Sequence, residues 1–333
     1  MKLFKKLGID LGTANSVVWE AGVGIVLNEP TVVAVGVEDR KVLAVGNEAK
    51  KMLGKTPEYI EIICPMEEGV ISDYEVTEAM LRYFMKQVMG VGWFFGPEVM
   101  ICVPAGVTQV EQRAVLDATL AAGAKKAYLI DEPLAAAIGA KIPVSEAHGN
   151  MIMDVGGGAA EAAVIALGGV VTHRGTRTGG KKMDMAIADY LRKKHNLIIG
   201  DQTAENIKIV LGSAIKLKKT ETLEVNGRDS IYGLPKSMMI DSDEIHEAIK
   251  PILDLIVKVI RDTLEVTPPE LVADIMDTGI VLSGGTSQLR NFNILVTREI
   301  GVSAHVAPEP QFCVIKGTGI AIENLEIYHR AIR

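Results

Sequence analysis

Two aspartates, each following an apolar segment and preceding a glycine-containing turn, are the first residues of this chain that could do chemistry. Asp154 lies between Met151–Met153 and a run of three glycines at 156–158, and Asp10 has the same place in LGIDLGTANSVVW at 7–19. A carboxylate at the end of a buried strand can hold a cation. Glycine has no Cβ, so backbone N–H groups in such a turn can approach an anion. The two segments therefore predict a cation held beside a phosphate.

Each of these segments predicts a strand, a tight turn and a second strand, because apolar residues flank the glycines on both sides. Such a hairpin differs from the phosphate loop that joins a strand to a helix. One hairpin opens each half of the chain, which predicts a duplicated domain with the phosphate between its halves. Two unrelated core hairpins are the alternative interpretation.

A further carboxylate follows the strand predicted at 127–130. Glu132 stands where ligand chemistry tends to lie in α/β folds, at the C-terminal end of a parallel strand. Alternatively, Glu132 is an acid at a helix start beside Pro133, where a negative charge favours the helix dipole. The residue types alone leave both interpretations open.

Two more segments could contact a nucleotide. Glu205 and Lys208 lie one turn apart in a helix predicted at 203–211, where they either contact a ribose or base or form a surface pair. A glycine-rich turn then joins a predicted strand at 279–283 to a helix, and such a turn admits a nucleotide closely. This turn consists of Gly284, Gly285, Thr286 and Ser287.

Composition limits the class of protein. A length of 333 residues predicts about two domains, and 48% hydrophobic with 23% charged residues is an ordinary soluble balance. The net charge of −7 argues against general nucleic-acid binding. The three cysteines show no metal-ligand spacing, so we expect reduced core thiols in a cytosolic protein. No transmembrane helix and no signal peptide are predicted.

Two apolar segments could instead meet a membrane surface. The first six residues, MKLFKK, place Met1, Leu3 and Phe4 among lysines, which suits an anionic membrane surface, although a frayed terminus is the simpler interpretation. Three adjacent aromatic residues lie in a loop between glycines and Pro97, and such a cluster is typical of a partner or membrane contact unless the loop is buried. They are Trp93, Phe94 and Phe95.

The order of these parts resembles the superfamily of actin, sugar kinases and heat-shock-chaperone ATPases. Within it, the segments GIDLGTAN, GIVLNEPTVVAV, VGNEAKKMLG, GVISDYEVTE, DEPLAAAIGA, PPELVADIMDTGIVLSGG and the closing GTG resemble the MreB family of bacterial actins nearly end to end. The resemblance implies an α/β, actin-like ATPase fold, with two duplicated ribonuclease-H-like domains and smaller inserted subdomains around a central nucleotide cleft. Its subdomains would be IA (1–32, 67–144 and 314–333), IB (33–66), IIA (145–182 and 244–313) and IIB (183–243).

The resemblance also implies a function. It implies ATP or ADP with Mg²⁺, self-assembly into protofilaments, and a cytoplasmic protein peripheral on the inner face of the cytoplasmic membrane, where it scaffolds wall synthesis and cell shape. The tip and the aromatic loop fall where family members attach to that anionic surface. The partners implied are a membrane-spanning cytoskeletal adaptor and cell-wall synthesis proteins, with no nucleic acid.

The family's functional residues transfer to positions of this chain. Asp10 and Asp154 would hold Mg²⁺ through waters, and Glu132 would orient the attacking water, since phosphoryl transfer is mostly positioning and charge stabilisation. Glu205 and Lys208 would contact the ribose side, and residues 284–287 would line the adenine end. The β- and γ-phosphates would be cradled by Thr13, Ala14, Asn15, Gly156, Gly157 and Gly158.

Three departures from the family pattern affect these expectations. Ala159-Ala160-Glu161 replaces Thr-Thr-Glu, and the lost hydroxyl at Ala159 predicts slow ATP hydrolysis, because one positioning hydrogen bond can be worth about 10²-fold in rate. Thr286 replaces a third glycine, so its Cβ would narrow the pocket or strain φ, which puts the base preference in doubt. The bulky aromatic loop favours strong membrane or partner contact.

Two other functions of the superfamily are the alternative interpretations. A small-molecule kinase would need a catalytic base and a sugar pocket, and the sequence shows no distinct candidate for either. A nucleotide-gated chaperone would need a substrate domain after the nucleotide-binding core, which the sequence up to Arg333 does not show.

Overall fold

Two five-stranded sheets of the same topology form the centre of the computed structural model, which describes residues 5–90, 96–329 and 331–333. In each sheet three antiparallel strands are followed by two strands parallel to the first of them. The first sheet contains β1 Lys6–Leu11, β2 Asn15–Glu20, β3 Gly24–Pro30, β9 Glu98–Val103 and β10 Lys126–Asp131. The second contains β11 Asn150–Val155, β12 Ala160–Ala166, β13 Gly169–Thr176, β17 Ile280–Ser283 and β18 Ala304–Val306. The repeat agrees with the predicted duplicated α/β fold.

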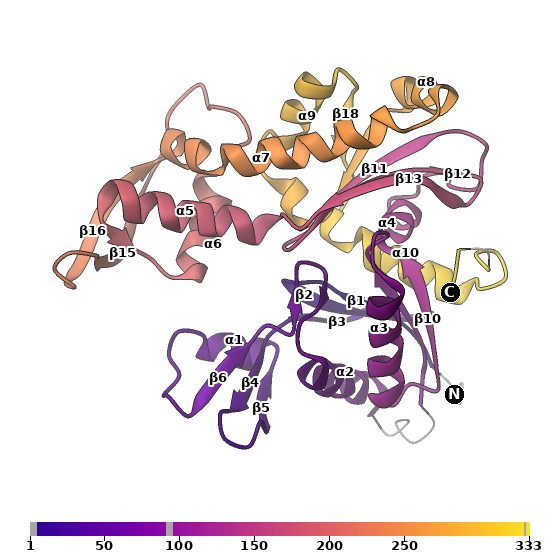
Figure 1. Cartoon of the computed structure of the whole chain (residues 1–333), viewed down its shortest axis with the longest axis horizontal. Coiled ribbons are helices and arrows are strands. Elements are labelled where there is room, and N and C mark those ends of the chain that lie inside the picture. The colour runs from indigo at the N-terminus through magenta and orange to yellow at the C-terminus, as the bar shows by residue number, and fades with distance from the viewer. Residues whose placement is uncertain (1–4, 91–95, 330) are drawn as a thin grey trace.

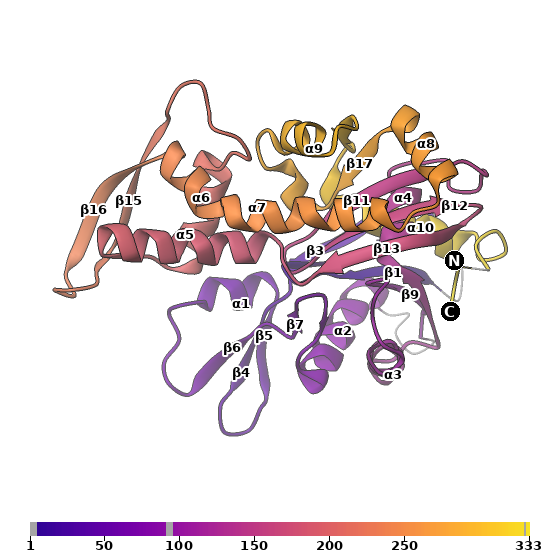
Figure 2. The ribbon, with the colours of Figure 1, turned by 45° about the horizontal axis from the view of Figure 1, so that its top comes forward.

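Helices cover the outer faces of both sheets (Figures 1 and 2). Capping fixes where several begin: Asp73 accepts a hydrogen bond from Val76 N, and Thr108 forms a capping box with Glu111. The helices of the first half are α2 Tyr74–Met89 and α3 Gln109–Ala121, and those of the second are α7 Ser242–Glu265, α8 Pro269–Thr278 and α9 Phe292–Ile300.

Two small-residue helices, α4 Glu132–Gly139 and α10 Cys313–Glu323, lie between the sheets. They approach closely, because a Cβ at Gly317 would collide with Ala135 O and one at Gly139 with Cys313 O. Their buried side chains join strands of both sheets in one apolar cluster. The two halves therefore meet along this helix pair.

Each half carries a smaller sheet at one end of the molecule (Figure 1). In the first half it contains β4 Val33–Gly36, β5 Val42–Val45 and β6 Ile60–Ile63, with α1 Asn47–Met52. In the second half it contains β14 Leu197–Ile198, β15 Thr222–Asp229 and β16 Pro235–Asp241, with α5 Gly180–His195 and α6 Asp201–Leu211. Short elements at the centre are β7 Met66–Glu67, β8 Val70–Ile71 and the 3₁₀ turns η2 Gly285–Gln288 and η3 Pro310–Phe312.

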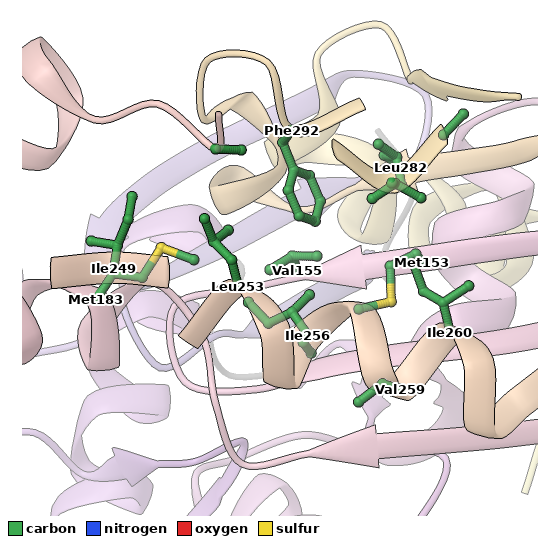
Figure 3. Packing of buried hydrophobic residues seen from close by; sticks show 14 of the residues in the cluster. Met153, Val155, Met183, Ile249, Leu253, Ile256, Val259, Ile260, Leu282 and Phe292 are labelled. Atoms are coloured by element: carbon green, nitrogen blue, oxygen red, sulfur yellow. The ribbon is translucent and has the colours of Figure 1, made fainter. Parts of the chain in front are cut away.

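The core of the second half lies under α7 (Figure 3). Ile256 and Ile260 of this helix pack over Met153, Val155 and Leu282 of the sheet, and all five are fully buried. Each such side chain stabilises the fold by roughly 1.5–3 kcal/mol relative to an exposed one. This packing holds β11 and β17 rigidly, and both strands end at the cleft described next.

The sequence predicted no transmembrane helix, and it predicted two segments that contact a membrane surface. None of the helices in the described part of the chain is long and apolar enough to cross a membrane. The predicted membrane contacts at Met1, Leu3, Phe4, Trp93, Phe94 and Phe95 lie outside the described residues. They therefore stay predictions.

Candidate functional site: a cleft between the halves

A cleft of about 420 Å³ lies between the two halves, a size typical of a small-molecule site. Both predicted hairpin turns open into it, together with the start of α4, parts of α5 and α6, and the turn that contains η2. The cleft brings together nearly all residues predicted from sequence: Asp10, Thr13, Ala14, Asn15, Glu132, Asp154, Gly156, Gly157, Gly158, Glu205, Lys208, Gly284, Gly285 and Thr286.

The turns of the two hairpins face each other at close range. A Cβ at Gly157 would lie 2.9 Å from the Cβ of Ala14, and one at Gly158 would collide with the Thr13 side chain. Gly156 N donates to Ala159 O at 2.9 Å and closes the second turn. Glycine is therefore needed here for space, which agrees with backbone that approaches a phosphate from both halves.

The two aspartates have equivalent hydrogen-bond partners on the neighbouring parallel strands. Ser283 Oγ of β17 donates to Asp154 Oδ1 at 2.6 Å, and Cys102 Sγ of β9 contacts Asp10 Oδ1 at 3.5 Å. Burial and the nearby carboxylate of Asp10 raise the pKa of the Cys102 thiol well above its usual range, so it stays protonated and acts as a donor. The duplicated fold thus repeats the carboxylate together with its donor.

Four carboxylates gather at this end of the cleft, those of Asp10, Glu132, Asp154 and Glu161. Burial, together with Asp154, raises the pKa of Asp10 to about 7, and burial raises that of Asp154 to about 6 despite the Ser283 hydrogen bond. Burial and the neighbouring acids raise the pKa of Glu132 well above its usual range. Burial also raises the pKa of Glu161 to about 7. Such a cluster of hard oxygen donors fits a divalent cation.

Glu132 combines the two interpretations that the sequence left open. It is the first residue of α4, beside Pro133, and it also lines the cleft directly after β10, which runs parallel to β9. A ligand atom of Glu132 lies within 4.8 Å of ligand atoms of Asp10 and Cys102. It can therefore reach a molecule that Asp10 also reaches.

Glu161 lines the cleft, although the sequence analysis assigned it no role in the site. Its carboxylate is buried, lines the cleft and accepts a hydrogen bond from Ala105 N at 3.2 Å. The strand register could have predicted its place in the cleft. Glu161 pairs directly with Asp154 across the hairpin, and paired residues point to the same face of a sheet.

Glu205 and Lys208 line the cleft but have different partners. Lys208 Nζ contacts Asp184 Oδ1 of α5 at 2.8 Å and also donates to Gly180 O. Glu205 Oε2 lies 4.0 Å from Lys50 Nζ of α1, on the opposite half. The surface-pair interpretation is therefore not what the structure shows, and contact with a ribose stays a prediction.

The turn before η2 differs from expectation in two details. Thr286 is not among the residues with positive φ, and its Oγ1 donates to Gly156 O at 2.8 Å, so its Cβ causes no backbone strain and the hydroxyl ties the two cleft turns together. Ser287 is buried and donates to Gly284 O at 2.7 Å. Its side chain therefore turns away from the cleft, and Gln288 lines it instead.

Two duplicated halves with paired aspartate hairpins around one cleft define the class of actin-like nucleotide-binding folds. Similarity to known proteins narrows this class. Residues 4–330 match the family description "MreB/Mbl protein", and the chain belongs to this family.

Its relatives match it nearly end to end. The "Cell shape-determining protein Mbl" of Bacillus cereus is 43% identical, with 99% of each chain covered. The "Cell shape-determining protein MreB" of Escherichia coli is 46% identical, with 97% of this chain and 94% of that protein covered. A crystal structure of MreB5 of Spiroplasma citri bound to ADP has a TM-score of 0.92 at 32% identity and covers 98% of both chains.

Proposed function

We propose that this chain is a nucleotide-binding bacterial actin that assembles with copies of itself into filaments and takes part in determining cell shape. The observation that carries the proposal is the cleft, in which glycine turns from both halves meet beside four carboxylates, two of them buried and two half-buried. Solved structures of the similar MreB5 carry ADP or AMPPNP, which supports a nucleotide as the occupant. The four-part division into subdomains IA, IB, IIA and IIB belongs to the same proposal.

The residues of the cleft have distinct roles in this proposal. The turns at 13–15 and 156–158 bind the phosphates through backbone N–H groups, and residues 284–286 approach the adenine end. Glu205 is free to reach the ribose when its distant contact with Lys50 opens, whereas Lys208 is held by Asp184. Asp10 and Asp154 would hold Mg²⁺ through waters, and a bound cation would offset the negative charge of the phosphates.

We propose further that hydrolysis is slow. Glu132 would orient the attacking water, because its carboxylate enters the cleft beside Asp10. Ala159 also lines the cleft and has only a methyl group to offer that water. Nucleotide binding then controls assembly, and phosphate release follows at a low rate.

Membrane attachment completes the proposal. The apolar tip and the aromatic loop would bind an anionic inner membrane surface, two weak anchors together giving stable attachment. The protein would then act in the cytoplasm on that surface, near a membrane-spanning adaptor and wall-synthesis proteins. Liposome flotation of the natural chain against a Trp93→Ala/Phe94→Ala variant tests the loop, and equal binding of both would contradict its role.

Sedimentation with nucleotide tests assembly. We expect the natural chain to pellet as filaments with Mg-ATP, and Gly158→Ala to stay in the supernatant, because the new Cβ collides with Thr13. Gly169→Ala is the matched control, since a Cβ there meets nothing within 4 Å. A natural chain that binds labelled ATP and never sediments, on lipid or off it, would contradict the filament function.

A further inference from the structure

The two hairpins of the duplicated fold differ at one position that faces the cleft. Asp10 pairs across its hairpin with Val17, whereas Asp154 pairs with Glu161. Both partner residues line the cleft and both are buried, at 3% and 8% exposure. The second half thus places a carboxylate where the first half has only an apolar side chain. The fold does not require an acid at this position, and burying a carboxylate costs free energy unless the group has a hydrogen-bond partner.

That partner comes from the other half of the molecule. Glu161 Oε2, on β12, accepts a hydrogen bond of 3.2 Å from the backbone N–H of Ala105, in the turn that follows β9. Hydrogen bonding to the backbone there opposes the effect of burial on the pKa of Glu161. On its other side the carboxylate lies against Gly175 of β13, where a Cβ would stand 3.2 Å from Oε1. The side chain is therefore confined between β13 and the opposite half.

Several other contacts between the halves beside the cleft are ion pairs between exposed side chains. Arg177 approaches Glu68 and Glu111 at 3.7 Å each, and Lys50 approaches Glu205 at 4.0 Å, all through side chains that are 31–63% exposed. Exposed ion pairs of this kind contribute little, because water and salt screen them. A hydrogen bond to a buried acceptor is screened less, and its loss leaves a buried polar group without a partner. The contact of Glu161 with Ala105 differs from these ion pairs because its acceptor is buried, so it can help to hold the phosphate end of the cleft closed.

We propose that Glu161 is a positioning residue that holds the two halves closed at the phosphate end of the cleft. It acts through the turn of residues 104–106, which it pulls against β12, and it does not itself contact the reacting atoms. The acceptor oxygen, not the negative charge, is what the position requires. This inference rests on the proposed nucleotide binding, since closure matters for function when a phosphate chain lies between the halves.

The test compares Glu161→Ala and Glu161→Gln with the natural chain and with Glu224→Ala, an exposed acid on β15 that serves as control. Two quantities are measured: the dissociation rate of a fluorescent ATP analogue, and amide hydrogen exchange at residues 105–107 with and without that nucleotide. Thermal unfolding of each variant shows that it is folded.

We expect Glu161→Ala to release the ATP analogue about ten- to a hundredfold faster and to lose exchange protection at Ala105, because the N–H of Ala105 then loses its acceptor. Glu161→Gln keeps an acceptor, so it should stay within about fivefold of the natural chain. Unchanged release and protection in Glu161→Ala would overturn the inference, and so would a glutamine variant as impaired as the alanine one. If the natural chain bound no nucleotide, the proposed function would fail, yet exchange at Ala105 without nucleotide would still decide the role of Glu161.

Discussion

Raising the pH in the absence of divalent cations should destabilise this protein through the carboxylates of its cleft. The pKa of Asp10 rises from its ordinary value of 3.8 to about 7 in the folded state. Below pH 3.8 the group is protonated in both folded and unfolded chains. Between the two values the folded chain holds more protons, so the free energy of unfolding falls as the pH rises. At pH 8 the loss from Asp10 is on the order of 4 kcal/mol, since one pKa unit corresponds to about 1.36 kcal/mol.

Replacing the group should remove that penalty. We expect Asp10→Asn to raise the free energy of unfolding by about 2–4 kcal/mol at pH 8 and to change it little at pH 4, because the asparagine carries no charge to bury. Relief of the repulsion with Asp154 acts in the same direction. The charge-neutral variant should also lose affinity for Mg-nucleotide, so stability and function would move in opposite directions.

Urea unfolding at pH 4, 6 and 8 in EDTA measures the effect, with Glu224→Gln on β15 as an exposed-acid control. Adding Mg²⁺ at pH 8 should restore part of the lost stability in the natural chain and little in Asp10→Asn, because a ligand of the folded state stabilises it. A natural chain whose stability rises steadily from pH 4 to pH 8 in EDTA would refute the reasoning. So would an Asp10→Asn variant that is less stable than the natural chain at pH 8.

Three further variants test separate parts of the structure. Ala159→Thr should speed phosphate release from Mg-ATP by up to about 10²-fold, measured with a coupled assay, and an unchanged rate would mean that the hydroxyl is not what limits hydrolysis. Lys208→Met leaves the half-buried Asp184 unpaired and should lower the free energy of unfolding by about 3–5 kcal/mol; Asp184→Asn added to it should recover most of the loss, and no recovery would contradict the pairing. Gly317→Ala places a Cβ against Ala135 O and should leave little soluble protein on expression, whereas Gly169→Ala should express normally; equal yields would contradict the close packing of α4 and α10.

Much of the site could be predicted because its residue types are set by backbone requirements. Gly157 and Gly158 follow from a turn that has no room for side chains. Asp10 and Asp154, each next to last in its strand, follow from a strand end that faces the cleft. The hairpins β1–β2 and β11–β12 were predicted likewise, because apolar residues flank the glycines on both sides.

The parts that could not be predicted depend on partners distant in sequence. Glu161 accepts a hydrogen bond from Ala105, and Lys208 pairs with Asp184 of a different helix. No local sequence pattern predicts either pair. Ser287 and Gln288 are both polar and uncharged, so their residue types do not indicate which of them faces the cleft. The geometry of the η2 turn decides this. In the ribbon β15–β16 one face is exposed and the other is mostly half-buried, where Leu223 and Val225 are followed by Gly227 and Asp229, so its apolar pattern was too weak to predict two strands.

The position of helix α10 in the chain affects the order in which the two halves can fold. Although it lies at the C-terminal end of the described chain, it packs against the first strand, where a Cβ at Gly8 would stand 3.1 Å from Gly319 N, and Trp19 Nε1 donates to Glu323. During synthesis on the ribosome, β1 and β2 therefore keep one apolar face exposed until α10 has been made. All five strands of the second sheet, from Asn150 to Val306, have by then been made. We expect the second half to become protease-resistant first, while the first half stays dependent on chaperones until the last helix emerges.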